Sequence, residues 1–267
     1  MITIKEMIKQ ANLQGYVDDN AESKVCQDII LKALSVSSMN RNATIKGGVV
    51  MRSISNDARR ATLDMDIDFI RYSLDDDSIR KFINKLNCVD GITVELIGQI
   101  TELKQQDYHG KRVFVRLIDA TGDSIESKID LGVHKNLSIE QEEYCFDLSS
   151  FDEGVSLLIN SKEQMFTEKL RSLLKFGYYS TRSKDIFDLS YLADLVDKRK
   201  LLECFQVYIF DDENMRENNM MDVCRRVNQT FSSDLFVNRL SQSKQNWIGK
   251  DCHEVLNNLV DFFNEIQ

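Results

Sequence analysis

The chain has 267 residues, of which 34 are Lys or Arg and 43 are Asp or Glu, so its formal charge at neutral pH is −9. With 42% hydrophobic and 29% charged residues, it has the composition of a folded globular protein and not of a disordered chain. No apolar run reaches the roughly 18 residues that a membrane-spanning helix needs, and the first residues lack the apolar stretch of a secretory signal. We expect a cytoplasmic protein of one large or two modest domains, with no membrane partner.

The predicted elements begin with an amphipathic helix over residues 20–36. From about residue 44 to residue 159 the apolar residues alternate with period two in several runs, which indicates strands over 65–72, 92–100, 111–118, 125–133 and 155–159. Residues 76–87 have helical spacing instead. After residue 160 the strand signal disappears, and the remaining apolar patterns are helical, over 165–176, 185–196, 220–231, 232–240 and 252–266.

These patterns predict an α+β chain in two parts. Residues 1–159 form a sheet flanked by helices, and residues 160–267 form an all-helical C-terminal domain. The six cysteines are scattered and show no CxxC or zinc-ligand spacing, so we expect free thiols that are mostly buried. None of the three histidines lies in a Ser or Cys triad motif, which argues against hydrolysis through a nucleophilic side chain.

The most informative stretch is an acidic strand over residues 60–72. Asp64, Asp66 and Asp68 alternate with apolar residues, so a strand places the three carboxylates on one face and the apolar side chains on the other. Like charges at this spacing repel unless a cation lies above them. Carboxylates at positions i and i+2 can reach the same hard cation, of which Mg²⁺ is the obvious candidate. The alternative is the solvated outer face of an edge strand.

Two further features lie on either side of this strand. Upstream, residues 44–50 resemble a short strand that ends at Gly47-Gly48 before a helix, an arrangement in which backbone amides can approach a phosphate. Downstream, Asp130 lies on a predicted strand and could complete a carboxylate triad with Asp64 and Asp66. On spacing alone, a half-exposed polar position is an equally good interpretation of Asp130.

Two helices of the C-terminal part carry charge beside an apolar stripe. Lys169 lies on or next to the stripe of the first helix, and Asp185 and Asp188 lie beside that of the next. A lysine is rarely buried without an anionic partner, so we expect Lys169 and Asp185 to form an ion pair across a shared cleft. Snorkelling of Lys169 and helix capping by Asp185 are the alternatives. Basic residues outnumber acidic ones around these motifs, by six to three in residues 161–185 and five to one in residues 41–60, which suits a phosphate-rich ligand.

The order of these motifs matches a known pattern over roughly residues 20–196. The motifs are Lys46-Gly47-Gly48, the run from Arg60 to Asp66, Tyr108-His109-Gly110-Lys111-Arg112, Ile129-Asp130, Glu168-Lys169-Leu170, and the run from Arg182 to Leu189. With them the chain resembles the AbiEii/AbiGii toxin family of nucleotidyltransferases, within the DNA polymerase β-like nucleotidyltransferase superfamily. The resemblance implies a nucleotidyltransferase-type mixed sheet followed by a helical domain that contributes Lys169 and Asp185 to the cleft.

The resemblance also implies roles for individual residues. Asp64, Asp66, Lys169 and Asp185 would be catalytic, whereas Lys46, Gly47, Gly48 and Lys169 would bind the nucleotide. Asp64, Asp66 and Asp130 would be the metal ligands, and Asp68 is left without a role. Val49 stands where the family often has Ser or Thr after the glycines.

The expected function is therefore a Mg²⁺-dependent, two-metal transfer of a nucleotide from an NTP to an RNA, with the 3′ end of a transfer RNA as the acceptor that the resemblance implies. The setting would be the toxin of a toxin–antitoxin or phage-defence system with a cognate antitoxin. A small molecule or a protein is the alternative acceptor. The remaining alternative is a catalytically silent binding module, against which the presence of Asp64, Asp66, Lys169 and Asp185 argues.

Overall fold

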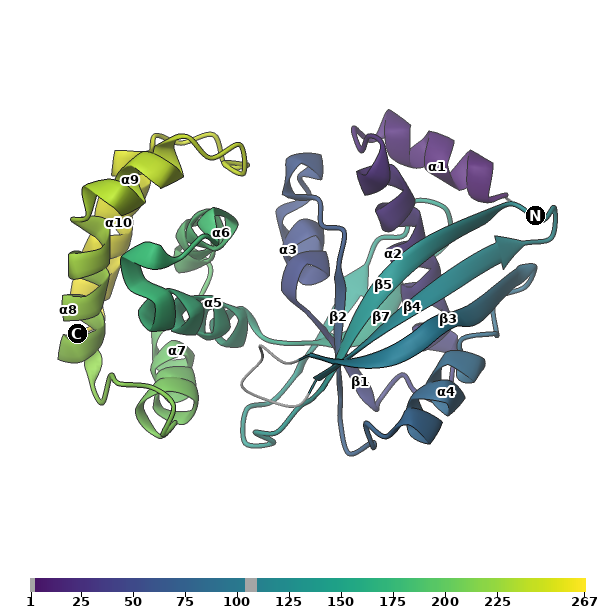
Figure 1. Ribbon diagram of the computed structural model, residues 1–267, viewed down its shortest axis with the longest axis horizontal. Helices are drawn as coiled ribbons and strands as arrows, with labels where there is room; N and C mark the ends of the chain where they lie inside the picture. Colours follow the sequence, from purple (N-terminus) through teal and green to yellow (C-terminus); the bar gives the residue numbers. More distant parts are fainter. Residues whose placement is uncertain (1–2, 104–109) are drawn as a thin grey trace. The chain divides into compact units, whose positions relative to one another are not determined.

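The computed structural model describes residues 3–103 and 110–267 (Figure 1). The chain divides into two compact units, Met1–Asn160 and Ser161–Gln267, here called unit 1 and unit 2. In the part of the chain that the structure describes, no helix is both long enough and apolar enough to span a membrane.

Unit 1 is built on a seven-stranded sheet with the strand order β3-β4-β5-β2-β1-β7-β6. Its strands are β1 (Ala43–Lys46), β2 (Met65–Phe69), β3 (Ile92–Leu103), β4 (Gly110–Asp119), β5 (Ser124–Val133), β6 (Glu142–Phe146) and β7 (Val155–Ile159). β2 pairs in parallel with β5 and β1 with β7, whereas the other neighbours are antiparallel. The predicted α+β class with a mixed sheet is therefore confirmed.

The helices of unit 1 are α1 (Ile4–Leu13), α2 (Asp19–Val36), α3 (Gly47–Ser55) and α4 (Asp76–Lys85), with a 3-10 turn, η1 (Ala58–Arg60). α2 packs on β5 and β7, and α4 packs on β3. The apolar residues of β2 face this core: Met65, Ile67 and Phe69 are fully buried, and the Phe69 ring lies 4.9 Å from that of Phe82 on α4. The acidic residues of β2 consequently occupy the opposite face of the sheet, as the alternation predicts.

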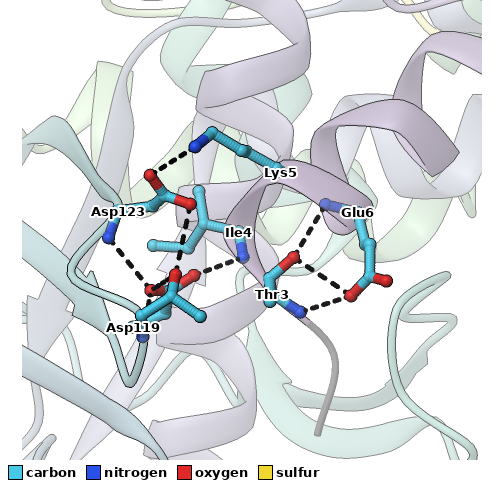
Figure 2. Close-up of polar contacts among 7 residues, drawn as sticks. Thr3, Ile4, Lys5, Glu6, Asp119 and Asp123 are labelled. Atoms are coloured by element: carbon cyan, nitrogen blue, oxygen red, sulfur yellow. Dashed lines mark hydrogen bonds and ion pairs between the residues drawn. The ribbon is translucent and has the colours of Figure 1, made fainter.

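Helix α1 was not among the predicted elements, and its position depends on contacts with a distant turn. Thr3 and Glu6 form a capping box, in which the Glu6 N–H donates to Thr3 Oγ1 at 3.3 Å and the Thr3 N–H donates to Glu6 Oε2 at 2.8 Å (Figure 2). The Ile4 N–H donates to Asp119 Oδ2 at 2.9 Å, and Lys5 pairs with Asp123 at 2.7 Å. The turn between β4 and β5 therefore holds the start of α1.

Unit 2 consists of helices, and its residues 161–267, all of which the structure describes, contain no strand. Its elements are α5 (Lys162–Phe176), the 3-10 turn η2 (Gly177–Tyr179), α6 (Ser183–Ala193), α7 (Lys198–Phe205), the π-helical turn η3 (Gln206–Phe210), α8 (Met220–Phe231), α9 (Asp234–Ser241) and α10 (Cys252–Glu265). Phe166 of α5 lies at its centre, with ring centroids 5.4 and 5.9 Å from Phe262 and Phe263 of α10. The predicted helical C-terminal part is confirmed.

The six cysteines are free thiols, as expected, and four of them are buried. Burial raises the pKa of Cys204 to about 12, so this thiol is an inert core residue.

Candidate active site

A row of charged side chains crosses four strands of the unit 1 sheet. Strand register places Lys46 of β1 opposite Asp66 of β2, Asp66 opposite Asp130 of β5, and Asp130 opposite Arg112 of β4. Residues that lie directly opposite each other point to the same face of a sheet. Along the row the charges therefore run positive, negative, negative, positive, and two carboxylates are neighbours at its centre.

Ion pairs hold the charged side chains that surround Asp66. Arg112 binds both oxygens of Asp130, at 2.7 and 2.8 Å, in the two-pronged geometry that is the strongest for this pair. Asp64 pairs with Lys128 at 2.6 Å, and Asp68 pairs with Lys46 at 2.8 Å. Asp68, for which the sequence suggested no role, is therefore a buried partner of Lys46.

Asp66, at the centre of this row, has a raised pKa. Burial raises the pKa of Asp66 to about 6, against the favourable influence of Lys46, and the negative charges of Asp130, Asp64 and Asp68 raise it further. The ionised form of this carboxylate is thus costly in the protein alone. A cation beside Asp66 would remove that cost.

The glycine pair begins α3 and faces the acidic strand. Gly47 has φ of +64°, a conformation that side chains disfavour, and a Cβ added there would overlap the Asp66 carboxylate. A Cβ at Gly48 would come within 2.7 Å of the Thr62 Cβ. The spacing of the run from Arg60 to Asp66 therefore has a steric basis, since Thr62 packs on one glycine and Asp66 on the other.

A buried polar network supports the segment that leads into β2, and sequence reasoning missed it. Gln27 of α2 donates from Nε2 to the Thr62 carbonyl at 2.9 Å and accepts a hydrogen bond from Arg52 of α3. Arg52 in turn pairs with Asp28 at 3.4 Å, and Lys24 also pairs with Asp28. Burial raises the pKa of Asp28 and lowers that of Lys24. The only sequence signal was the presence of polar residues within the apolar surface of α2.

Unit 2 contains a second cluster of candidate residues. Lys169 of α5 is buried and binds Asp185 at 3.1 Å and Asp188 at 2.6 Å, both on α6. Asp188 has no exposed surface and accepts a further hydrogen bond from Trp247 Nε1 at 3.0 Å. Arg182 pairs with Asp185 at 2.5 Å. The expected ion pair between Lys169 and Asp185 is confirmed, so snorkelling does not describe Lys169.

The predicted site residues thus fall into two groups. Lys46, Gly47, Gly48, Asp64, Asp66 and Asp130 lie together on unit 1, and Lys169 and Asp185 lie together on unit 2. The expectation that both groups share one cleft stays a prediction. Tyr108 and His109 of the third motif lie outside the described residues, and Arg112 of that motif is the partner of Asp130.

The residues present suit a divalent cation in their chemistry. Asp64, Asp66 and Asp130 offer the hard oxygen ligands that Mg²⁺ prefers, and Asp66 carries negative charge that its surroundings leave under-compensated. In the described parts of the chain, no three His, Cys, Asp or Glu side chains gather as closely as a metal site requires. Asp64 and Asp130 are ion-paired with Lys128 and Arg112 instead, so the metal triad also stays a prediction.

Comparison with known proteins identifies a family whose model matches the chain and solved structures that are similar to it. The model of the family described as "Nucleotidyl transferase AbiEii toxin, Type IV TA system" matches residues 29–247, which is most of the chain. The crystal structure of an antigenic nucleotidyltransferase-like protein from Paracoccidioides brasiliensis is similar with a TM-score of 0.45 and 15% identity, covering 88% of this chain and 97% of that one. No curated protein matches the sequence. The chain belongs to the AbiEii nucleotidyl transferase toxin family of type IV toxin–antitoxin systems.

Proposed function

We propose that this chain transfers a nucleotide from an NTP to the 3′ end of a transfer RNA in a Mg²⁺-dependent reaction. Family membership supports nucleotidyl transfer and a toxin role. The observation that carries the proposal is the position of Asp66, which faces Asp130 across the strands and packs against the Gly47 backbone. This arrangement places a carboxylate whose ionisation a cation would favour next to a turn whose backbone amides can bind phosphate.

Asp64, Asp66 and Asp130 are the residues that would hold the metal. When bound, Mg²⁺ supplies positive charge to the triphosphate and activates the attacking hydroxyl. Asp66 would direct its carboxylate toward this charge. Ionisation of Asp66 becomes favourable when a cation is present. The nucleophile is the hydroxyl of the acceptor, so the protein needs no nucleophilic side chain.

The start of α3 would bind the triphosphate. The first N–H groups of a helix have no partner within the helix, and the Lys46 side chain at the N-cap makes no capping hydrogen bond to them. Gly47 and Gly48 allow close approach of a phosphate because they have no side chains. Lys46 neutralises Asp68 beside this turn and so prevents a repulsive charge from facing the phosphates.

Lys169 and Asp185 would take part in the same reaction. Lys169 is a point charge suited to a phosphate oxygen, and its ion pairs with Asp185 and Asp188 fix its position. We also propose that a cognate antitoxin restrains the activity, as the type IV toxin–antitoxin family suggests. NTPs and transfer RNA are the substrates of the proposed reaction, so we place its action in the cytoplasm.

The test is a labelling assay with purified protein, Mg²⁺, total transfer RNA and each α-labelled NTP in turn. Asp66→Asn keeps the size of the side chain but removes its charge, and should lower labelling by at least about 100-fold. Glu22→Gln is the matched control, because it removes a carboxylate from the exposed side of α2 in the same unit. Lys169→Met should also abolish labelling.

The other outcomes discriminate between the alternatives. If label appears on a protein or a small molecule and none appears on RNA, the chain is a transferase with a different acceptor. NTP binding without transfer to any acceptor would support the silent binding module. Labelling that survives Asp66→Asn would contradict the assignment of Asp66.

A further inference from the structure

Figure 1 shows the turn between α5 and α6 of unit 2. This segment carries three exposed aromatic side chains. Phe176, Tyr178 and Tyr179 are exposed to 58%, 37% and 66%, and we call these three residues the aromatic turn. The rings of Tyr178 and Tyr179 lie 4.3 Å apart. Single exposed apolar residues are common on protein surfaces. Three exposed aromatic rings within four residues form a patch, which indicates a binding surface.

The backbone of the aromatic turn is held in place from two other helices. Arg239 of α9 donates from Nη1 to the Ser180 carbonyl at 2.7 Å and to the Tyr178 carbonyl at 3.3 Å. Arg226 of α8 donates from Nε to the Leu174 carbonyl at 3.1 Å. The Arg226 guanidinium also lies against Gly177, where a Cβ would come within 2.6 Å of Nη2. The turn is therefore preorganised while its rings stay exposed.

The charge around the aromatic turn is positive although the whole chain is acidic. Residues 175–184 contain Lys175, Arg182 and Lys184 and no acidic residue, in a chain with a net charge of −9. Arg182 is largely exposed and reaches Asp185 at 2.5 Å. Exposed rings next to basic side chains are typical of surfaces that bind single-stranded nucleic acid, because the rings stack on bases and the cations attract phosphates.

We propose that the aromatic turn is a stacking surface for the unpaired bases at the end of the RNA acceptor. The proposal rests on the proposed function, and it names the residues that would recognise the RNA. Its position suits this role. Lys169 lies about 10 Å along α5 from Phe176 at the usual helical rise, and Arg182 links the turn to Asp185. An RNA end on the aromatic turn would lie beside the Lys169–Asp185 pair. A folded protein surface suits the patch less well, because the charged residues within residues 175–184 are all basic.

The test compares binding of a fluorescein-labelled single-stranded RNA, a duplex RNA of the same length, and total transfer RNA, all at one ionic strength. Tyr178→Ala/Tyr179→Ala should weaken binding of the single strand and of transfer RNA by about 10- to 100-fold. Tyr178→Phe/Tyr179→Phe keeps both rings and should stay within about threefold of the wild type. Leu13→Ala, which removes an exposed apolar side chain on α1 of unit 1, is the control and should bind normally.

Two further measurements separate the possible failures. Thermal melts show that each variant is folded, and NTP binding should be unchanged in the Tyr178→Ala/Tyr179→Ala variant. If the wild type binds RNA and this variant binds it equally well, the aromatic turn is not the RNA surface although the acceptor can still be RNA. If the variant instead loses a protein partner while it keeps RNA, the patch is a protein interface and the proposal is wrong. If the wild type neither binds nor labels any RNA, the proposed acceptor fails as well.

Discussion

Asp66 and Asp130 lie directly opposite each other on the parallel strands β2 and β5, with their carboxylates on the same face of the sheet. Adjacent like charges destabilise a sheet unless they are compensated. Arg112 compensates Asp130 with two hydrogen bonds, whereas burial keeps the pKa of Asp66 raised to about 6 in spite of Lys46. The protein thus maintains one carboxylate whose ionised form is disfavoured unless a further cation lies beside it.

The first prediction concerns pH. Asp66 has its pKa at about 6 in the folded protein against 3.8 as its ordinary value, so the folded state binds more protons between these two values. The free energy of unfolding should therefore fall as the pH rises from about 4 to about 6 and lose no more above that range. Asp66→Asn cannot titrate, so in metal-free buffer it should exceed the wild type by roughly 1–3 kcal/mol at neutral pH.

Urea melts at several pH values measure this difference. The gap between the variant and the wild type should close as the pH approaches about 4, because Asp66 is then protonated in both states. A gap that does not depend on pH would show that Asp66 is not the group responsible.

The second prediction concerns metal. Mg²⁺ should raise the melting temperature of the wild type by a few degrees, since a ligand that binds only the folded state stabilises it. The rise should be larger above the pKa of Asp66, because a proton competes with the metal for the carboxylate. Scanning fluorimetry measures the melting temperature. NaCl at the same ionic strength is the control for screening of charges. An equal Mg²⁺ effect in Asp66→Asn would exclude Asp66 as a ligand.

The third prediction concerns the glycine turn. Gly47→Ala introduces both a disfavoured φ and an overlap with Asp66, and should cost about 2–4 kcal/mol in stability and abolish NTP binding. Gly98→Ala is the matched control, because Gly98 has a similar φ of +68° with open space around it and should cost only about 1 kcal/mol.

A double variant isolates the steric part of this effect. Asp66→Ala removes the overlapping carboxylate, so Gly47→Ala should cost less stability in that background. Equal costs in the two backgrounds would contradict the contact between Gly47 and Asp66.

The fourth prediction concerns the buried lysine of unit 2. Lys169→Met removes the ammonium that neutralises Asp185 and the fully buried Asp188, and should destabilise the protein by about 3–5 kcal/mol. Adding Asp188→Asn should restore a large part of the loss, because it removes one of the buried charges. Chemical denaturation of the four proteins in this cycle gives the coupling energy, and additive costs would argue against the interaction.

The fifth prediction concerns the support beneath the acidic strand. Gln27→Leu removes the hydrogen bonds to the Thr62 carbonyl and to Arg52, and should cost about 2 kcal/mol because Arg52 is buried and the Thr62 carbonyl is partly buried. It should also lower transferase activity, since Thr62 precedes β2, the strand that carries Asp66. Glu22→Gln, on the same helix, should leave stability and activity unchanged.

Local patterns were sufficient for much of the fold. The alternation in residues 60–72 predicts which face of β2 is acidic, because successive side chains of a strand point to opposite sides. Helical spacing likewise predicts α2 and five of the six α-helices of unit 2, whereas α7 was not predicted. Prediction failed where an element is short and its apolar pattern weak, as in β6, a five-residue strand at the edge of the sheet with two consecutive glutamates.

The sequence by itself determined the class of fold and identified the charged residues of the candidate site. The Lys169–Asp185 pair could be expected from the sequence, but only the tertiary structure decided the partners of the other charged residues. Asp66 and Asp130 are neighbours because β5 pairs with β2, and Arg112 reaches Asp130 because β4 pairs with β5. Gln27 supports Thr62 from a helix that is far away in the sequence. Such contacts depend on strand order and register, which arise from the packing of the whole core and not from any local pattern.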